Sequence, residues 1–432
     1  MRSTLLVTAA ALMGASTGPL LAQNYGSSAP QTPPPVMQPP PASAPATATA
    51  VAAPPLCSMK ISGGARPKLV ALQKATDAKD AAAMPGALEA ARAAVKTPDD
   101  NCVLGQLMLK GAADRSDMAG MGAAVDVLVK SGVANAVALG PIASTIGKMR
   151  YNAKDYAGAA TAFQQTVAIV PNDAEAHVLL GDTKAKLNQI DDGMAEFAKA
   201  FAIKKAAGQP IDESWLKRAV ALSYDAKSPR VYAISRQWLS AYPSPKNWRD
   251  SLKIYSFVSG QPSAELVDVY RLQRANKALQ GDADYANYAI ALLQKGYPGE
   301  AKAVLEEGIA AGKVQRSSAS IGPLLAQATT KSAGDRASLV ALAKAATASA
   351  DSKKAMNVAD AYYGYGDYAQ AATLYRTALA KSGADAPTAN LRLGMALAMA
   401  GDKAGAQVAL TAVTGPKAEI AQYWLIYLAQ RG

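Results

Sequence analysis

The sequence of 432 residues contains one histidine and two cysteines, and only 6% of its residues are aromatic. A metal site built from several histidines or cysteines therefore lacks its ligands. Half of the residues are hydrophobic, which argues against a chain that is disordered throughout. Because alanine is abundant and aromatic residues are few, we expect a core of small side chains at close helix contacts.

The usual signatures of catalysis are also missing. No G-x-x-x-x-G-K-[ST] phosphate loop occurs, and Gly120-Met121-Gly122 lacks the third glycine of a dinucleotide fingerprint. A Ser, His and acid triad would have to use His177, for which packing or partial exposure is the preferred interpretation. Paired acids such as Asp191-Asp192 point in different directions on a helix and favour solvent exposure over glycoside hydrolysis. We therefore predict a protein that is not an enzyme, with no catalytic residues, no cofactor and no metal.

Residues 1–22 have the anatomy of a secretory signal peptide. A basic residue, Arg2, precedes an apolar run over 5–13, which is too short to span a bilayer. The alternative, a buried N-terminal helix, is disfavoured by the many prolines that follow. No cysteine follows the expected cleavage after Ala22, so lipid attachment is not expected there. No later stretch approaches about eighteen uncharged apolar residues, so the mature chain is expected to lack a transmembrane segment and to be periplasmic or secreted.

Residues 23–56 carry no charge and contain two runs of three prolines, at 33–35 and 39–41. Proline cannot donate a backbone hydrogen bond and favours extended chain. This segment is predicted to be a disordered Pro/Ala-rich linker. The alternative is a ligand for a proline-binding groove.

The two cysteines are Cys57, where the linker ends, and Cys102. In an oxidising compartment they can form one intramolecular pair, and closing that loop would stabilise the fold by roughly 4 kcal/mol. We predict a Cys57–Cys102 disulfide, with two free thiols or an intermolecular bond as the alternatives.

Several positions recur at a step of 34 residues, at helical spacing within each unit. The recurring pairs are Gly147 and Gly181, Tyr156 and Ile190, Ala159 and Gly193, and Phe163 and Phe197. A related pattern returns near the C-terminus with Gly366, Tyr368, Ala371 and Tyr375, then with Gly394, Gly401, Ala406 and Leu410.

These residues, together with the helix breaker Pro171 and with Ala200, resemble the motif of the tetratricopeptide repeat (TPR) family. The resemblance implies an all-α, right-handed α-solenoid of helix pairs over 57–432, in one elongated domain. Dividing its length by the period gives about eleven units, which we interpret as about ten pairs followed by a capping helix at about 418–430 that includes Trp424 and Tyr427. The clearest repeats are expected at 140–173, 174–207, 282–315, 352–385 and 387–414.

Two candidate binding surfaces follow. The first is an aromatic surface in the stretch from Tyr224 to Phe257, where aromatics are several times denser than in the whole chain; packing within diverged repeats explains this density equally well. Its candidates are Tyr232, Trp238, Tyr242, Trp248 and Tyr255. The second is the concave groove on which TPR proteins bind extended peptides. The resemblance assigns to it Lys353, Asn357, Asp360, Tyr363 and Arg392.

The formal net charge of +12 includes Arg2 of the leader, so the mature chain carries +11. This excess favours anionic partners, although scattered lysines that only aid solubility are the alternative. Nucleic acid is disfavoured because the chain is expected to be exported and lacks a basic run with interleaved aromatics. The leading hypothesis is a non-enzymatic scaffold or assembly module that binds an envelope protein or extended peptide. The alternative is a polysaccharide- or peptidoglycan-associated binding or export factor.

Overall fold

The structure is a computed structural model that describes residues 54–58, 60–261 and 266–431. The expected signal peptide and most of the expected linker lie outside the described residues. Within them the regular structure is entirely helical, with 21 α-helices and a short 3-10 helix at Gly415–Lys417. Twenty of these α-helices precede α21 (Ala418–Ala429), and most of them pack as a pair with a neighbour in the sequence. Within these residues no helix is both long and apolar enough to cross a lipid bilayer.

The helices group into two compact units that divide between Ile211 and Asp212, where the sequence predicts one continuous domain. Unit 1 contains α1 (Arg66–Asp77), α2 (Ala83–Ala94), α3 (Pro98–Asp114), α4 (Met118–Ser131), α5 (Ala136–Asn152), α6 (Tyr156–Ile169), α7 (Ala174–Lys186) and α8 (Ile190–Ala206). Unit 2 contains α9 (Glu213–Asp225), α10 (Arg230–Ala241), α11 (Pro245–Ser259), α12 (Val267–Ala275), α13 (Gly281–Lys295), α14 (Pro298–Ala310), α15 (Gly322–Ser332), α16 (Asp335–Ala348), α17 (Ser352–Gly364), α18 (Tyr368–Leu379), α19 (Ala386–Ala400), α20 (Lys403–Thr411) and α21 (Ala418–Ala429).

The repeating residues of unit 1 mark the closest contact within each helix pair. Gly147 of α5 lies under the ring of Phe163 of α6, so that a Cβ added there would come within 2.5 Å of the ring. Gly181 of α7 meets Phe197 of α8 in the same way, with a corresponding distance of 2.9 Å. The glycine lets the two helix axes approach, and the phenylalanine fills the space beside them. The period in the sequence is therefore the period of this contact.

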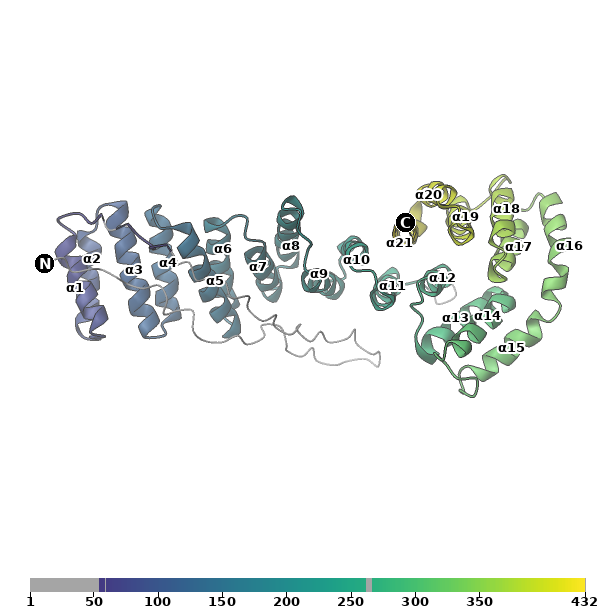
Figure 1. The fold of residues 1–432 in the computed structure, drawn as a ribbon, viewed down its shortest axis with the longest axis horizontal. Helices are drawn as coiled ribbons and strands as arrows, with labels where there is room; N and C mark the ends of the chain where they lie inside the picture. The colour runs from purple at the N-terminus through teal and green to yellow at the C-terminus, as the bar shows by residue number, and fades with distance from the viewer. Residues whose placement is uncertain (1–53, 59, 262–265, 432) are drawn as a thin grey trace. The chain divides into compact units, whose positions relative to one another are not determined.

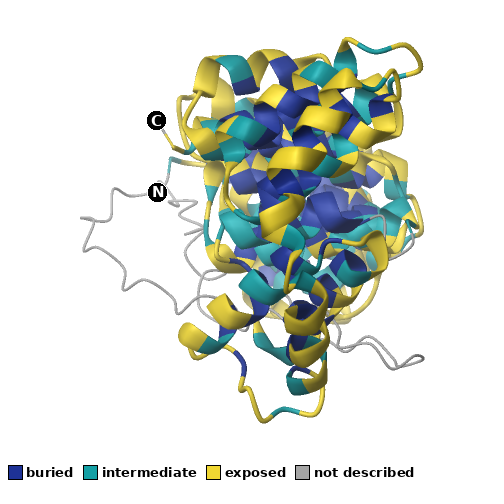
Figure 2. Ribbon diagram, turned by 90° about the vertical axis from the view of Figure 1, so that its right-hand side faces the viewer, coloured by how far each residue is buried: buried dark blue, intermediate teal, exposed yellow. Residues whose placement is uncertain are grey.

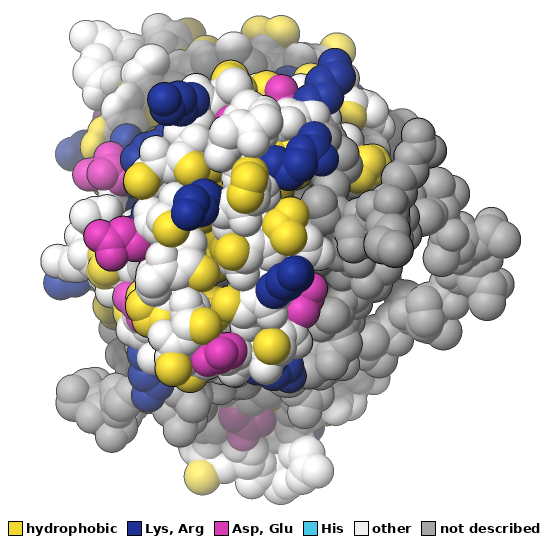
Figure 3. Space-filling view, turned by 90° about the vertical axis from the view of Figure 1, so that its left-hand side faces the viewer, with side chains coloured by type: hydrophobic (Ala, Val, Ile, Leu, Met, Phe, Trp, Pro, Cys, Tyr) yellow, Lys and Arg dark blue, Asp and Glu magenta, His cyan; other side chains and the backbone are white. Residues whose placement is uncertain are grey.

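The chain enters unit 1 through a short segment before α1 that is fastened to α3 and α5. Cys57 forms a disulfide with Cys102 of α3, with an S–S length of 2.05 Å and a Cα–Cα distance of 5.7 Å. This is the pairing that the sequence predicts. The backbone N–H of Asn135, which caps α5, donates to the carbonyl of Leu56 over 2.9 Å. Figure 3 shows the end of this unit formed by α1 and α2, where apolar side chains lie between basic and acidic ones.

Unit 2 closes on itself because its last helix returns to its first ones. Helix α21 packs on α10 and α12 as well as on α19 and α20 (Figure 1). Trp248 donates from Nε1 to Oε1 of Gln430 over 3.1 Å, and the amide of Gln430 donates to the carbonyl of Leu239 over 2.8 Å. Arg236 of α10 forms an ion pair with Glu419 of α21. Figure 2 shows the buried positions, in dark blue, between the helices.

Helices α15 and α16 depart from this ring. Helix α14 packs directly on α17, and the close approach is visible at Gly364, where an added Cβ would lie 2.7 Å from Cβ of Glu300. The chain between these two helices therefore makes an excursion: α15 packs on α13 and α14, whereas α16 packs on α17 and α18. Consecutive helices usually form a tight pair here, but α15 and α16 have little contact with each other. Figure 1 shows them diverging along one edge of the unit.

Candidate interaction surface

The five residues expected in a concave groove fall into two groups. Lys353 and Asn357 are exposed on the first turns of α17. Asp360, Tyr363 and Arg392 lie inside unit 2, where Asp360 and Tyr363 are buried and the side chain of Arg392 is only 14% exposed. For these three the structure shows an internal role, because a residue that packs inside the ring does not line an open groove.

Asp360, Arg392 and three further residues form a buried charge cluster. Its members come from α12, α14, α17 and α19 and bond to one another. They are Asp268, Arg271, Glu300, Asp360 and Arg392.

Asp360 is the centre of this cluster. Its carboxylate accepts hydrogen bonds from Nη1 of Arg271 over 3.1 Å and from Nη1 of Arg392 over 2.6 Å. The hydroxyls of Tyr297 and Tyr375 each donate to it over 2.7 Å. A buried carboxylate with four donors is fully satisfied, which is the condition under which a buried charge is tolerated.

Arg271 connects the cluster to its aromatic surroundings. It forms a two-pronged interaction with Glu300, at 3.0 Å from Nε and 2.7 Å from Nη2, and its guanidinium lies 4.3 Å from the ring centroid of Tyr363. The neighbouring carboxylates raise the pKa of Arg271 well above its usual value, against the effect of burial. The ring of Tyr363 therefore makes a cation–π contact with the buried guanidinium of Arg271.

Asp268 occupies the side of the cluster nearest to α19. Burial favours its neutral form, but Arg392, Lys417 and Arg271 outweigh burial and lower its pKa. Counting Lys417, which is 3.7 Å from Asp268, three cations face the three carboxylates of the cluster. This balance leaves the cluster as a set of internal ion pairs that join distant parts of the ring.

The aromatic residues expected at a surface mostly pack in the interior of unit 2. Trp238, Trp248 and Tyr255 are at most 4% exposed, and Tyr232, which is half-buried, packs on Tyr255 with ring centroids 5.6 Å apart. Tyr242 is also half-buried. For the three buried residues the structure supports the packing alternative, since Trp248 and Tyr255 belong to the core beside α21 and Trp238 is buried with its Nε1 donating to Glu213 of α9.

His177 is a buried polar residue of unit 1. Its Nδ1 lies 2.7 Å from Oε2 of Glu196, and its Nε2 lies 3.1 Å from the carbonyl of Pro171. Lys184 and Lys199 also contact this carboxylate. The histidine therefore joins α7 to α8 and to the loop before α7. Within the described part of the chain, no three His, Cys, Asp or Glu residues are grouped so that they could hold a metal ion.

The α15–α16 excursion carries two exposed apolar side chains on one helix together with an excess of basic residues. Val340 and Leu342 of α16 are 75% and 45% exposed. The stretch from Lys313 to Lys354 contains seven basic residues and only two acidic ones. Sequence reasoning missed this surface, although the signal is present: nine of the fourteen residues in 335–348 are apolar, and basic residues lie both among them and on either side.

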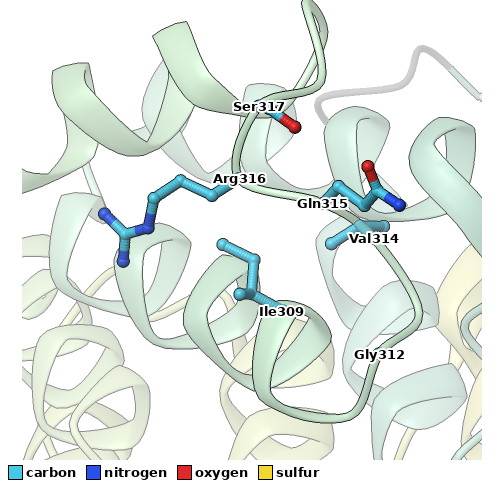
Figure 4. A pocket seen from close by; sticks show the side chains of 6 residues that line it. All are labelled: Ile309, Gly312, Val314, Gln315, Arg316 and Ser317. Carbon is cyan, nitrogen blue, oxygen red and sulfur yellow. The ribbon is translucent and has the colours of Figure 1, made fainter.

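A shallow depression lies at the start of the excursion. It has a volume of about 700 Å3 and is formed by the end of α14 and the loop that follows. Figure 4 shows Ile309 and Val314 on its apolar side, with the side chain of Arg316 extending away from them. The depression is widely open, so it suits contact with a macromolecule better than enclosure of a small ligand.

No protein-family model matches the chain, and no curated protein matches it. Three solved structures align with it at low sequence identity. A tetratricopeptide repeat protein from Parabacteroides merdae is 11% identical, with 78% of this chain and 100% of that chain covered and a TM-score of 0.24. A chain of Naa15/Naa10 bound to HypK-THB is 16% identical, with 82% and 65% covered and a TM-score of 0.27. A chain of the APC/C hetero-tetramer Cut9-Hcn1 is 12% identical, with 85% and 90% covered and a TM-score of 0.21. The helix pairs of this chain are defined by the packing of its own helices.

Proposed function

We propose that this protein is a non-enzymatic scaffold of the bacterial cell envelope that binds another protein. The observation that carries the proposal is the exposed apolar face of α16, set in a basic surface on an otherwise closed ring of helices. Arg271, Glu300, Asp360 and Arg392 of the buried charge cluster are bonded to one another in the interior. A surface that combines exposed apolar side chains with charge of one sign favours a macromolecular partner.

Location in the envelope rests on the leader and on the cysteines. Disulfides persist in oxidising compartments and are rare in the cytosol, and the only two cysteines of this chain are paired. Non-reducing mass mapping of freshly exported protein tests this part alone. Free thiols at Cys57 and Cys102 would contradict it.

The scaffold proposal is tested by cross-linking in intact cells, followed by purification of the tagged full chain. We expect one envelope protein to co-purify with the chain at a fixed molar ratio. The same protein should also co-purify without the cross-linker when the salt concentration is moderate. Recovery of the chain alone, from cells in which it is abundant, would contradict the proposal.

The carbohydrate alternative depends on exposed aromatic rings, and Phe257, beside the half-buried Tyr224, offers one. Phe257 of α11 is 58% exposed and its ring centroid lies 5.3 Å from that of Tyr224. If the protein binds peptidoglycan or another polysaccharide, Phe257→Ala should reduce its retention on the insoluble polymer. Retention that survives this substitution and disappears with added salt would indicate non-specific attraction of a basic protein.

A further inference from the structure

The outer face of α16 is an apolar helix surface that nothing in the described chain covers. Its inner face, with Leu339, Ala343 and Ala346, packs against α17 and α18. The rest of the helix surface is exposed, and it carries apolar side chains together with Arg336, Ser338, Lys344 and Thr347. Val340 and Leu342 flank a row of alanines at helical spacing, which are Ala337, Ala341, Ala345 and Ala348.

Both ends of α16 are held in place. At its first turn, the hydroxyl of Tyr365 donates to Oδ2 of Asp335 over 3.0 Å. At its last turn, Nζ of Lys381 donates to the carbonyls of Ala346 and Thr347 over 2.9 and 3.0 Å. With its inner face packed as well, α16 presents its outer face in one fixed position, and a partner would lose little free energy in ordering it.

The surface around α16 is basic. Lys331, Arg336, Lys344, Lys353 and Lys354 are all exposed near it in the sequence. The stretch from Lys313 to Lys354 has only two acids, Asp335, which accepts from Tyr365, and Asp351, which caps α17 by accepting from the backbone N–H of Lys353, so basic residues outnumber acidic ones. The field that a partner meets is therefore positive.

We propose that α16 docks an acidic amphipathic helix of a partner protein, an inference that rests on the scaffold function proposed above. A helix satisfies its own backbone hydrogen bonds, so α16 cannot add an extended peptide as a strand does and must bind by side-chain packing. The alanine row lets a second helix approach closely, and Val340 and Leu342 border it. Acidic residues beside the apolar stripe of the incoming helix would face Arg336 and Lys344. With 14 residues, α16 offers a contact about 21 Å long.

Two other occupants fit less well. A second copy of this chain would place Lys344 and Arg336 against the same basic residues, which is repulsive. A lipid surface is usually engaged by aromatic and leucine side chains, and the stretch from Lys313 to Lys354 contains no aromatic residue.

The test uses the full chain and a fluorescent helical peptide as probe. The peptide carries leucines along one face and glutamates on both flanks; a second peptide has lysines in place of the glutamates, and a third has the same composition in an order without helical periodicity. We expect binding of the first alone. Val340→Asp should weaken that binding at least about tenfold and Lys344→Glu by a smaller factor. The matched control is Val408→Asp on α20, because Val408 is 73% exposed in the same unit and lies outside the proposed surface.

Several results would overturn the proposal. These are equal binding of all three peptides, loss of binding in Val408→Asp to the same extent as in Val340→Asp, or displacement of the probe by vesicles of phosphatidylcholine with phosphatidylglycerol. The scaffold function is judged separately by the cross-linked partner of the full chain. If that partner is recovered equally with the wild type and with Val340→Asp, the scaffold stands and the α16 site is wrong.

Discussion

Arg271 and Asp360 are 89 positions apart in the sequence, yet their side chains meet at 3.1 Å and both are fully buried. This contact joins α12 to α17 across the interior of unit 2. Neither group can be reached by bulk water, so each depends on the other and on the remaining members of the buried charge cluster. The contact is therefore more than a local ion pair, since it holds the ring in one closed arrangement.

Removing one partner of this pair should destabilise unit 2. Arg271→Met leaves the carboxylates of Asp360 and Glu300 buried with fewer counter-charges, and we expect a loss of about 3–5 kcal/mol in the free energy of unfolding. All four tryptophans of the chain lie beyond residue 211, so urea unfolding followed by tryptophan fluorescence reports on unit 2.

The control is Lys302→Met, which removes an ion pair between α14 residues whose side chains are 39% and 47% exposed. We expect a loss below about 1 kcal/mol there. Similar midpoints for Arg271→Met and the wild type would show that the cluster does not hold unit 2 together.

The helix pairs could be predicted from the sequence, whereas the buried charge cluster could not. The difference lies in how far apart along the chain the contacting residues are. The contact between Gly147 and Phe163 joins neighbouring helices of one pair, so it repeats at a fixed step along the chain and is visible as a period. The contact between Asp268 and Arg392 spans 124 positions and occurs once. No local pattern encodes it, because it depends on the closure of the ring.

The candidate sites show the same limit. Family resemblance assigned Asp360 and Arg392 to an open groove, because it fixes a residue's position on its helix but not what the ring places against that helix. The aromatic density near Trp238 was visible, but density alone does not distinguish a core from a surface. For α16 the error would run the other way. Its apolar residues are evident in the sequence, but their pattern is that of an ordinary buried helix, so the sequence alone does not indicate an exposed surface.

The closest backbone approach in unit 1 gives a second prediction. In Gly193→Ala, the new Cβ would lie 2.6 Å from the carbonyl oxygen of Gly181, and neither backbone can move without separating α7 from α8. We expect a loss of about 2 kcal/mol or more in the stability of this helix pair. Hydrogen exchange of peptides from α7 and α8, followed by mass spectrometry, measures it.

Gly86→Ala is the matched control, because an added Cβ at that helical position meets no atom within 4 Å. Alanine has the higher helix propensity, so this variant should be more stable than the wild type by up to about 1 kcal/mol. Unchanged exchange of α7 and α8 in Gly193→Ala would count against a tight glycine contact.

A third prediction concerns the disulfide that fastens the entering segment. Replacing both Cys57 and Cys102 by serine frees a loop that spans 45 positions, and on the chain-entropy model this costs roughly 4 kcal/mol of stability. The segment near Leu56 would then be held mainly by hydrogen bonds to Asn135 and Asp100. We expect limited proteolysis of the double variant to cut first in this segment. A reductant should make the wild type sensitive to proteolysis at the same place and should not change the cleavage of the variant. If the reduced wild type resists proteolysis, the disulfide does not hold this segment.

The fourth prediction is a pH dependence that originates at Asp100, which is fully buried at the start of α3. Burial favours the neutral acid, but hydrogen bonds from the backbone and hydroxyl of Ser62, from Thr97 and from the backbone of Lys96 outweigh it and lower the pKa to about 2. The folded state therefore binds the proton more weakly than the unfolded chain, whose pKa is 3.8. This contribution to stability is complete above about pH 4 and disappears as the pH falls toward 2, and its size is about 2 kcal/mol.

Asp100→Asn should accordingly be less stable than the wild type at neutral pH, by about 2 kcal/mol, and the difference should shrink as the pH falls through that window. Urea unfolding of both proteins at a series of pH values, followed by hydrogen exchange in α3, measures the difference directly. Glu89→Gln, at an exposed position of α2, is the control and should show no such convergence. If the difference in unfolding free energy between Asp100→Asn and the wild type stays constant down to pH 2, the asparagine disturbs packing. The charge of Asp100 then contributes nothing to stability.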